Sequence, residues 1–195
     1  METKVPYPIN QIKIIYFLLT ATFIVACHKQ EIKSTDAGIQ MLAGRLIYNG
    51  KLFTGRYIEE IPAMEIRQIT EYKYGLENGE SIMKNLQGQI LEKRYYQDGL
   101  KVGIHRSWFL NGNDRVYSEF KDGKYVGDRW EWFENGKPAV YSKFDQEGRI
   151  LVEKKWNRYG KIYMNQVFAE DGSSVGLPGS KNCKPIKSVD EPILK

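Results

Sequence analysis

Hydrophobic and polar residues alternate with a period of two over much of the chain. Trp130 and Trp132 alternate with the charged residues Arg129 and Glu131, and a second alternating run follows over residues 139–144. The side chains of a strand point alternately to the two faces of a sheet, so each run predicts a half-buried strand. Because an Asn-Gly pair separates the two runs, the pattern predicts a β-hairpin.

The hairpin pattern recurs every 24 residues. Five columns keep this step, one of tryptophans, three of glycines and one of aromatic residues that close each unit: Trp108, Trp132, Trp156; Gly88, Gly112, Gly136, Gly160; Gly75, Gly99, Gly123; Gly79, Gly103, Gly127; Tyr72, Tyr96, Phe120, Phe144, Phe168. Such a fixed step is the signature of a repeat architecture. We therefore expect an all-β fold, an elongated antiparallel meander of about five 24-residue β-hairpin repeats.

The turns of the meander are expected at two kinds of dipeptide. Asn111-Gly112 and Asn135-Gly136 are predicted to form tight primed turns, in which glycine adopts a positive φ without steric cost. Asp98-Gly99 and Asp122-Gly123 mark the opposite turns, which join one hairpin to the next. The glycines at 79, 103 and 127 are expected to let the sheet bend or to give an aromatic ring room to lie over the backbone.

Four segments follow from these patterns. We expect a signal peptide at residues 1–26, a tether at 27–44, the repeat array at 45–172 and an extended tail at 173–195. The tail is rich in Gly, Pro, Ser and Lys and has no period, which favours an extended segment or one that is docked along an open edge of the sheet.

The first segment has the pattern of an export signal. Lys4 and Lys13 precede an apolar run of 13 residues at 14–26, shorter than the roughly 20 residues that a membrane-spanning helix needs. Residues 24–27, Ile-Val-Ala-Cys, resemble a bacterial lipobox, which implies cleavage after Ala26 and acylation of Cys27. Several acyl chains anchor a protein stably. We expect an exported lipoprotein, with the outer membrane favoured over the inner; the alternative is a buried core helix that ends in a buried cysteine.

Charge, cysteine and histidine content bear on function. The net charge of +5 is dispersed, so there is no nucleic-acid footprint. With Cys27 acylated, Cys183 has no partner within the chain, which excludes a disulfide scaffold and a metal site made of cysteines alone. His28 falls in the tether, and His105 shares a column with Arg129 and Ser81, which favours a surface position. We expect no enzyme, no cofactor and no metal site.

The aromatic columns are the feature that could bind a partner. Tryptophans that recur at 24 residues fall in a row along one face of the sheet, either as the core of the ribbon or as an exposed platform. Polar and tyrosine side chains in the same repeats are expected on or near the polar face. The predicted binding residues are Trp108, Trp132, Trp156, Arg106, Arg129, Tyr117 and Tyr141.

The repeat unit resembles the variant MORN repeat. In "DGKYVGDRWEWFENGKP" and its copies, two glycines four residues apart precede an aromatic stretch and an Asn-Gly turn, over about residues 48–172. The resemblance implies protein–protein contact or scaffolding, as in exported lipoproteins and YwqK-type antitoxins with such arrays. We therefore expect a non-enzymatic envelope lipoprotein that binds the membrane through Cys27 and a protein partner through its sheet. The alternatives are an antitoxin or immunity protein that neutralises a cognate toxin, and a redox or metal accessory protein that uses Cys183.

Overall fold

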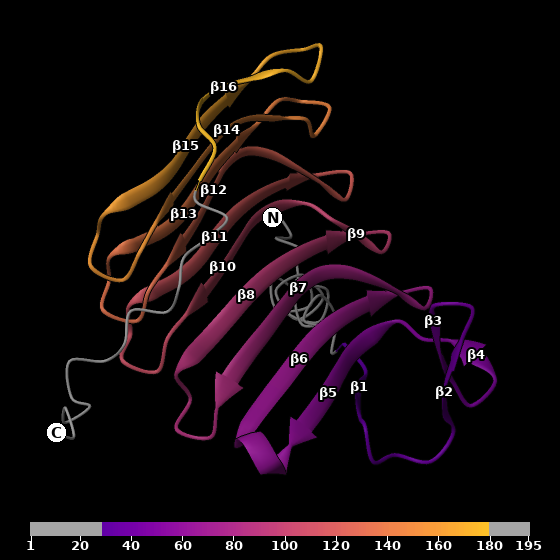
Figure 1. Ribbon diagram of the computed structural model, residues 1–195. Coiled ribbons are helices and arrows are strands. Elements are labelled where there is room, and N and C mark those ends of the chain that lie inside the picture. Colours follow the sequence, from indigo (N-terminus) through magenta and orange to yellow (C-terminus); the bar gives the residue numbers. More distant parts are fainter. Residues whose placement is uncertain (1–28, 180–195) are drawn as a thin grey trace, which may run out of the picture.

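The computed structural model describes residues 29–179 and shows one large, mostly antiparallel sheet (Figure 1). The residues Cys27, His28 and Cys183, for which the sequence made predictions, lie outside the described residues. The large sheet has 13 strands. Twelve of them lie side by side in chain order: β1 (Glu31–Lys33), β5 (Gly55–Ile61), β6 (Ile66–Lys73), β7 (Leu76–Asn85), β8 (Ile90–Gln97), β10 (Gly103–Trp108), β11 (Asp114–Lys121), β12 (Lys124–Trp132), β13 (Pro138–Phe144), β14 (Ile150–Trp156), β15 (Ile162–Phe168) and β16 (Ser174–Leu177). The short β9 (Leu100–Lys101) pairs with β8 alone.

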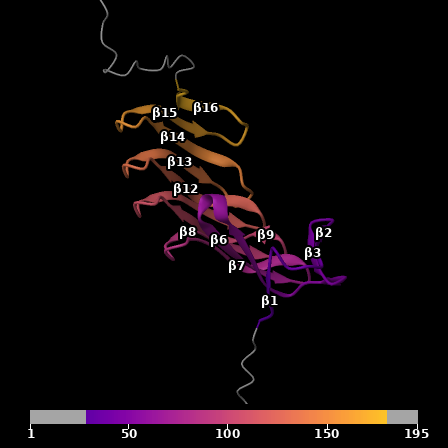
Figure 2. The ribbon, with the colours of Figure 1, turned by 90° about the horizontal axis from the view of Figure 1, so that it is seen from below.

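The predicted all-β antiparallel meander is confirmed. From β5 to β16 each strand pairs with the next in antiparallel fashion, except that β8 pairs with both β9 and β10, and the short β1 adds to β5 in parallel. Seen from below, the strands form a single layer with turns along both long edges (Figure 2). The alternating pattern fits this arrangement, because each strand must cover two faces with opposite side chains.

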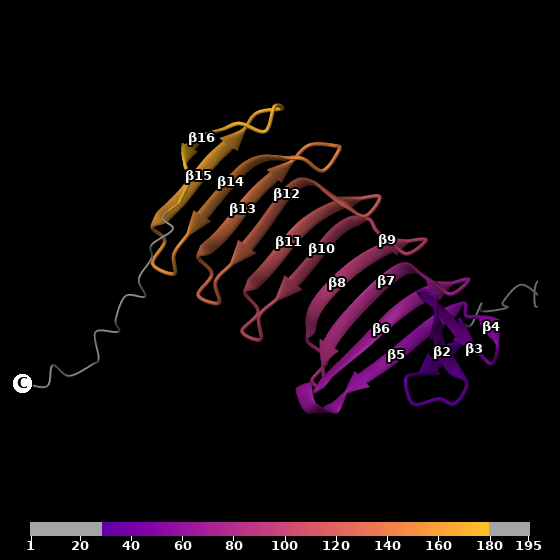
Figure 3. The same ribbon diagram turned by 45° about the vertical axis from the view of Figure 1, so that its right-hand side comes forward.

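A small second sheet lies at the N-terminal end of the large one (Figure 3). It consists of β2 (Ile39–Leu42), β3 (Arg45–Tyr48) and β4 (Lys51–Leu52). Ile32, Leu46 and Phe53 are buried together beneath it and pack against Tyr57 and Tyr72 of the large sheet. These residues form a closed apolar cluster that covers one face of the array at that end.

The expected segment boundaries differ from the observed ones. Residues 27–44, expected as a tether, contain β1 and β2, whereas β16, in the tail expected at 173–195, pairs with β15 at the open edge, one of the two arrangements expected of the tail. These strands lack the 24-residue columns, so the repeat pattern gave no sign of them. An array end gains from added strands, since they cover an open edge. A 3₁₀ turn, η1 (Pro62–Met64), joins β5 to β6.

The two kinds of turn lie at opposite edges as expected, but their backbone conformations differ from the prediction. Asp98-Gly99 and Asp122-Gly123 have positive φ at both residues, as a primed turn requires. In the Asn-Gly turns only the glycine has a positive φ, and the Gly112 amide donates to the carbonyl oxygen of Phe109 at 2.9 Å. The prediction that the Asn-Gly pairs form primed turns was therefore wrong. They close longer turns with a single left-handed glycine.

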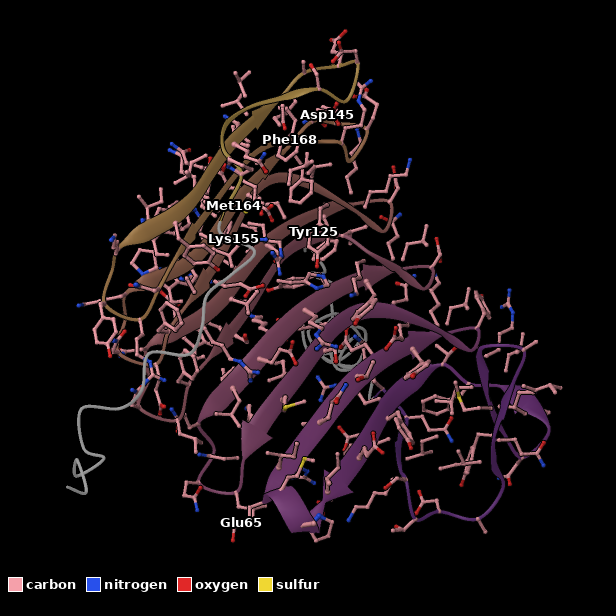
Figure 4. The ribbon with its side chains drawn as sticks, viewed as in Figure 1. Glu65, Tyr125, Asp145, Lys155, Met164 and Phe168 are labelled. Atoms are coloured by element: carbon pink, nitrogen blue, oxygen red, sulfur yellow. The ribbon has the colours of Figure 1, made fainter. Side chains whose placement is uncertain are left out.

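Hydrogen bonds between successive turns hold the single layer together. Along one long edge, which we call the aspartate edge, turn amides donate to carbonyl oxygens of the preceding turn: Gly75 to Phe53 at 2.7 Å, Gly99 to Glu77 at 2.8 Å and Gly123 to Lys101 at 2.9 Å. Along the other, the asparagine edge, side chains donate to the next turn: Gln89 to Leu110 at 3.0 Å, Asn111 to Glu134 at 3.0 Å and Asn135 to Arg158 at 3.3 Å. Figure 4 labels one residue at each edge, Glu65 at the asparagine edge and Asp145 at the aspartate edge.

Two glycines of the third column lie where strands bend at a β-bulge, which is one of the two roles expected of this column. A Cβ atom at Gly79 would lie 2.2 Å from Oε2 of Glu71, and one at Gly127 would lie 2.2 Å from Oε2 of Glu119. Carboxylate side chains, rather than aromatic rings, therefore lie over these two glycines. In both cases the strand register shifts at the glutamate, which places a β-bulge there.

Candidate interaction surface

Strand register divides the repeat array into two chemically different faces. Residues directly opposite each other in an antiparallel pair share a face. One row, which defines the serine face, runs across successive strands as His105, Ser118, Arg129, Ser142 and Glu153. The neighbouring row points to the opposite side and defines the tryptophan face: Arg106, Tyr117, Trp130, Tyr141 and Lys154.

A cluster of stacked rings lies on the tryptophan face. The ring centroid of Trp130 is 4.4 Å from that of Tyr141, 5.9 Å from that of Trp132 and 6.4 Å from that of Trp156. The planes of the three indoles differ by 16° and 18°, an offset-stacked arrangement that aromatic quadrupoles favour. These side chains are half-buried, so they stabilise the sheet and form its surface at the same time.

Arg106 joins Trp108 to this cluster. Its guanidinium carbon lies 5.7 Å from the Trp108 ring centroid and 5.9 Å from that of Tyr117, and its Nη2 atom is 3.1 Å from Oδ1 of Asp114. The distances to the Trp108 and Tyr117 rings are both within cation–π range. Of the seven predicted binding residues, six therefore share the tryptophan face. The seventh, Arg129, lies on the serine face, because it is directly opposite Ser118 and Ser142.

On the tryptophan face, the hydroxyl groups of two tyrosines donate hydrogen bonds to carboxylates. The Tyr117 hydroxyl donates to Oε1 of Glu119 at 2.8 Å, and the Tyr141 hydroxyl donates to Oδ1 of Asp128 at 2.9 Å. Burial raises the pKa of both tyrosines, and the hydrogen bonds to the carboxylates raise it further. Both rings are thus held in one orientation as neutral phenols.

A hollow lies beside Trp108 on the same face. It has a volume of about 420 Å³ and is lined by Lys93, Tyr95, Gly103, Ile104, Arg106 and Trp108. Ile104 is exposed at its edge. Its lining is mainly apolar with cationic groups at the rim, so the surface offers a recess next to the stacked rings rather than a flat plane alone.

The serine face is closed by its own side chains. Thr70, Ser81, Ser118 and Ser142 are buried, and Ser142 is only 1 % exposed. Longer side chains from alternate strands carry ion pairs across these short ones: Arg94–Glu92 at 2.5 Å, Lys155–Glu153 at 3.1 Å, and Arg129–Glu131. Their methylene stems cover the serines while their charges are paired. Figure 4 shows Tyr125, Lys155, Met164 and Phe168, which also belong to this face, over β12, β14 and β15.

His105 belongs to the interior of the serine face. It is 7 % exposed, and its Nε2 atom lies 2.8 Å from the carbonyl oxygen of Tyr95. Its ring lies between those of Tyr96 and Phe120, at 5.7 and 4.5 Å. Burial lowers its pKa, and the charges of Lys101 and Arg94 add to that effect. The expectation of a surface position was wrong, because the column that it shares with Ser81 is an inward one.

The tryptophans are not the buried core of the array. The buried apolar residues of the repeats are instead Tyr96, Phe120 and Val126. A trough of about 510 Å³ on the serine face is lined in part by Met83, Glu92 and Arg94, and the last two form an ion pair with each other. The tryptophan face is therefore the better candidate for an interaction surface.

Trp130, at the centre of the ring cluster, is absent from the predicted set. That set was chosen by recurrence at 24 residues, and the positions 24 residues before and after Trp130 hold Arg106 and Lys154. The signal that could have found it is its spacing of two from Trp132, which puts both on one face of a strand.

Within residues 29–179, no group of three or more His, Cys, Asp and Glu side chains is placed to hold a metal ion. The same part of the chain contains no helix with the length and apolar character to cross a membrane.

Compared with known proteins, the chain matches no protein-family model, and no curated protein is significantly similar to it. The resemblance to variant MORN repeats therefore stays a prediction from the sequence.

Proposed function

We propose that this protein is a non-enzymatic interaction module, an envelope lipoprotein that is anchored through acylated Cys27 and binds a protein partner through a MORN-like sheet. The observation that carries the proposal is the tryptophan face, where aromatic side chains extend from Trp108 on β10 to Trp156 on β14. Strands β10 to β14 make their extensive contacts with neighbouring strands of the sheet. The small sheet packs on the serine face, at Tyr57 and Tyr72, and so does not cover the tryptophan face.

The chemistry of this face suits protein recognition. Tryptophan, tyrosine and arginine are the residues that most often dominate the binding energy of protein interfaces. Here they are held in place before any partner arrives, by ring stacking around Trp130 and by the hydrogen bonds of Tyr117 and Tyr141. Side chains that are already ordered lose little entropy on binding. The surface is thus prepared for a partner at little further cost.

Other groups in the array favour binding over catalysis. His105 is buried and engaged by the backbone of Tyr95. Glu119 and Asp128 accept hydrogen bonds from tyrosines, with no histidine or nucleophile placed beside them in the part of the chain that the structure describes. A catalytic base needs an oriented partner and a reacting atom within reach. These carboxylates serve instead to orient the rings.

A comparative pull-down tests the proposal. Acylated protein with an affinity tag after Lys195 would be incubated with solubilised envelope membranes, as wild type, as Trp132→Ala and as Lys155→Ala. We expect one abundant partner with the wild type, a loss of at least about tenfold with Trp132→Ala, as for a hot-spot residue, and no loss with Lys155→Ala, which alters the opposite face.

The outcomes separate the candidate functions. Equal capture by the two variants would contradict a role for the tryptophan face. A toxin as the captured partner would favour the antitoxin alternative. The intact mass of the purified protein tests acylation of Cys27 independently, and metal analysis of the same sample tests the accessory role of Cys183.

A further inference from the structure

Exposed apolar side chains gather at the N-terminal end of the aspartate edge. Met41 and Leu42 in the β2–β3 hairpin are 62 % and 64 % exposed, Leu52 at the end of β4 is 47 % exposed, and Tyr74 in the β6–β7 turn is 65 % exposed. Their neighbours Leu46 and Phe53 are 1 % and 3 % exposed, so the small sheet has a buried side and an apolar outer rim. Packing within the chain explains the apolar residues on the buried side. It does not explain the exposed apolar residues of the rim.

The part of the rim around Arg45, Leu52 and Tyr74 is held in place by contacts between the small sheet and the β6–β7 turn. The Leu46 amide donates to the carbonyl oxygen of Gly75 at 2.8 Å, and the Gly75 amide donates to that of Phe53 at 2.7 Å. Arg45 adds a hydrogen bond from Nη1 to the carbonyl oxygen of Tyr74 at 3.0 Å. The small sheet is thereby attached to the β6–β7 turn, which brings apolar residues from two sheets together.

Basic side chains flank the rim. Arg45, Lys51 and Lys73 form no ion pair with any carboxylate among the described residues, and the Lys73 ammonium lies 5.9 Å from the Tyr74 ring centroid. Apolar side chains flanked by uncompensated cations are typical of surfaces that bind the headgroup region of anionic bilayers. A protein partner would not need this combination, whereas an anionic membrane complements both parts of it.

The start of the described chain lies beside the same rim. Lys29 forms a 2.6 Å ion pair with Glu71, two residues before Lys73, and Lys29 and Lys73 line a common hollow. Cys27 is two residues earlier, so its backbone is within about 7 Å of Lys29 by chain length alone. Acyl chains on Cys27 would therefore enter a membrane next to this edge of the sheet.

We infer that the rim made of Met41, Leu42, Leu52 and Tyr74, with Arg45, Lys51 and Lys73, lies against the anionic bilayer that holds the acyl chains of Cys27. The inference rests on the proposed acylation of Cys27. It sets an orientation: the sheet meets the membrane at the N-terminal end of its aspartate edge, the asparagine edge points away, and the tryptophan face is open to a partner from the side. The short link from acylated Cys27 to Lys29 would thus position the rigid sheet and its binding surface.

The asparagine edge offers a matched control. Met64, Leu86 and Leu110 are 69 %, 65 % and 70 % exposed there, as apolar as the rim but on the opposite edge from the start of the chain. Acylated protein with Cys183→Ser would carry an environment-sensitive fluorophore at Leu42→Cys or at Leu110→Cys. The protein would be placed in vesicles of phosphatidylethanolamine and phosphatidylglycerol that contain a nitroxide-labelled phospholipid as quencher.

We expect quenching at residue 42 to exceed quenching at residue 110 by about threefold, because side chains at an interface sit roughly 5–10 Å into the boundary of headgroups and acyl chains. Replacing Lys51 and Lys73 by Glu, or phosphatidylglycerol by phosphatidylcholine, should bring the two values together. Equal quenching at the two sites in acylated protein, or stronger quenching at residue 110, would overturn the inference and leave the binding role of the tryptophan face intact. A chain without acyl groups on Cys27 would remove the proposed anchor together with this orientation.

Discussion

The two faces of this sheet are stabilised in different ways. On the serine face, short side chains such as Ser118 and Ser142 are buried beneath long ones whose charges pair on the same strand. On the tryptophan face, Trp130 and its neighbours stack on one another and stay half-buried. A sheet without a second layer must bury each face with its own side chains. The serine face satisfies its polar groups within the protein, and the tryptophan face leaves part of its ring surface available to a partner.

This difference identifies the face that can bind. Covering the serine face further would desolvate ion pairs that are already matched, which gains little. Covering the tryptophan face would remove additional aromatic surface from water, which is favourable in proportion to the area buried. We therefore expect substitutions on the serine face to reduce stability alone, and substitutions on the tryptophan face to reduce binding as well.

The largest effect on stability is expected at Phe120, a buried ring of the serine face. Its side chain is 8 % exposed and lies 4.5 Å, ring to ring, from both His105 and Tyr125. Removing it leaves a cavity between three strands, so Phe120→Ala should lower the free energy of unfolding by about 3 kcal/mol. Chemical denaturation would measure this loss, with Leu110→Ala, which is 70 % exposed, as the control expected to change it by less than about 0.5 kcal/mol. Equal effects would mean that the serine face is not a closed core.

Trp130→Ala should be less destabilising than Phe120→Ala but should abolish binding. Trp130 contacts three rings, yet it keeps part of its surface in water, so a loss of roughly 2 kcal/mol is expected. Thermal denaturation would measure stability, and partner capture at a temperature where both proteins are folded would measure binding. Trp130→Phe retains a ring and should recover much of both. Full capture by folded Trp130→Ala would refute the assignment of this face.

The meander could be predicted from the sequence, because two periods coincide in it. The step of two defines strands, and the step of 24 shows that each hairpin repeats its neighbour, which leaves an antiparallel ribbon as the simple arrangement. The same logic placed Trp108, Trp132 and Trp156 on one face. It could not find β1 and β2, since strands outside the repeats need no repeat pattern of their own, and it left open whether the tail docks along the open edge, as β16 does.

Burial could not be predicted from residue type. Ser118 and Ser142 look like surface residues, yet they are buried because neighbouring arginine, lysine and glutamate side chains lie across them. His105 looks like a variable residue, yet it is buried between the rings of Tyr96 and Phe120. The tryptophans look like a core, yet a single layer leaves them at the surface. Likewise Asn111 and Asn135 were expected to shape their own turns through backbone conformation. Their side-chain donors instead reach the next turn along the edge.

Acid should destabilise the serine face through His105. Its pKa is lowered in the folded protein, so below the ordinary value of about 6.5 the unfolded chain takes up the proton first. The contribution of neutral His105 to stability is therefore complete above that pH and is lost as the pH falls through the lowered value. Denaturation midpoints between pH 7.5 and 5 should decline for the wild type. The decline should be shallower for His105→Gln, while Trp130→Phe should keep the slope of the wild type. Parallel slopes in all three proteins would exclude His105 as the cause.

The smallest effect is expected at the asparagine edge, which joins repeats regardless of face. Asn135 donates from Nδ2 to the carbonyl oxygen of Arg158 at 3.3 Å and accepts from the Lys137 amide through Oδ1 at 3.1 Å. Both bonds are exposed, so Asn135→Ala should cost about 1 kcal/mol. Asn111→Ala should cost less, because Asn113 donates to the same Glu134 carbonyl oxygen at 2.9 Å. Asn135→Asp keeps the acceptor and loses the donor, so urea denaturation of the three variants separates the bond within the turn from the bond between repeats. If Asn135→Asp is as stable as the wild type, the contact with Arg158 contributes nothing, and the repeats are joined by their strands and faces alone.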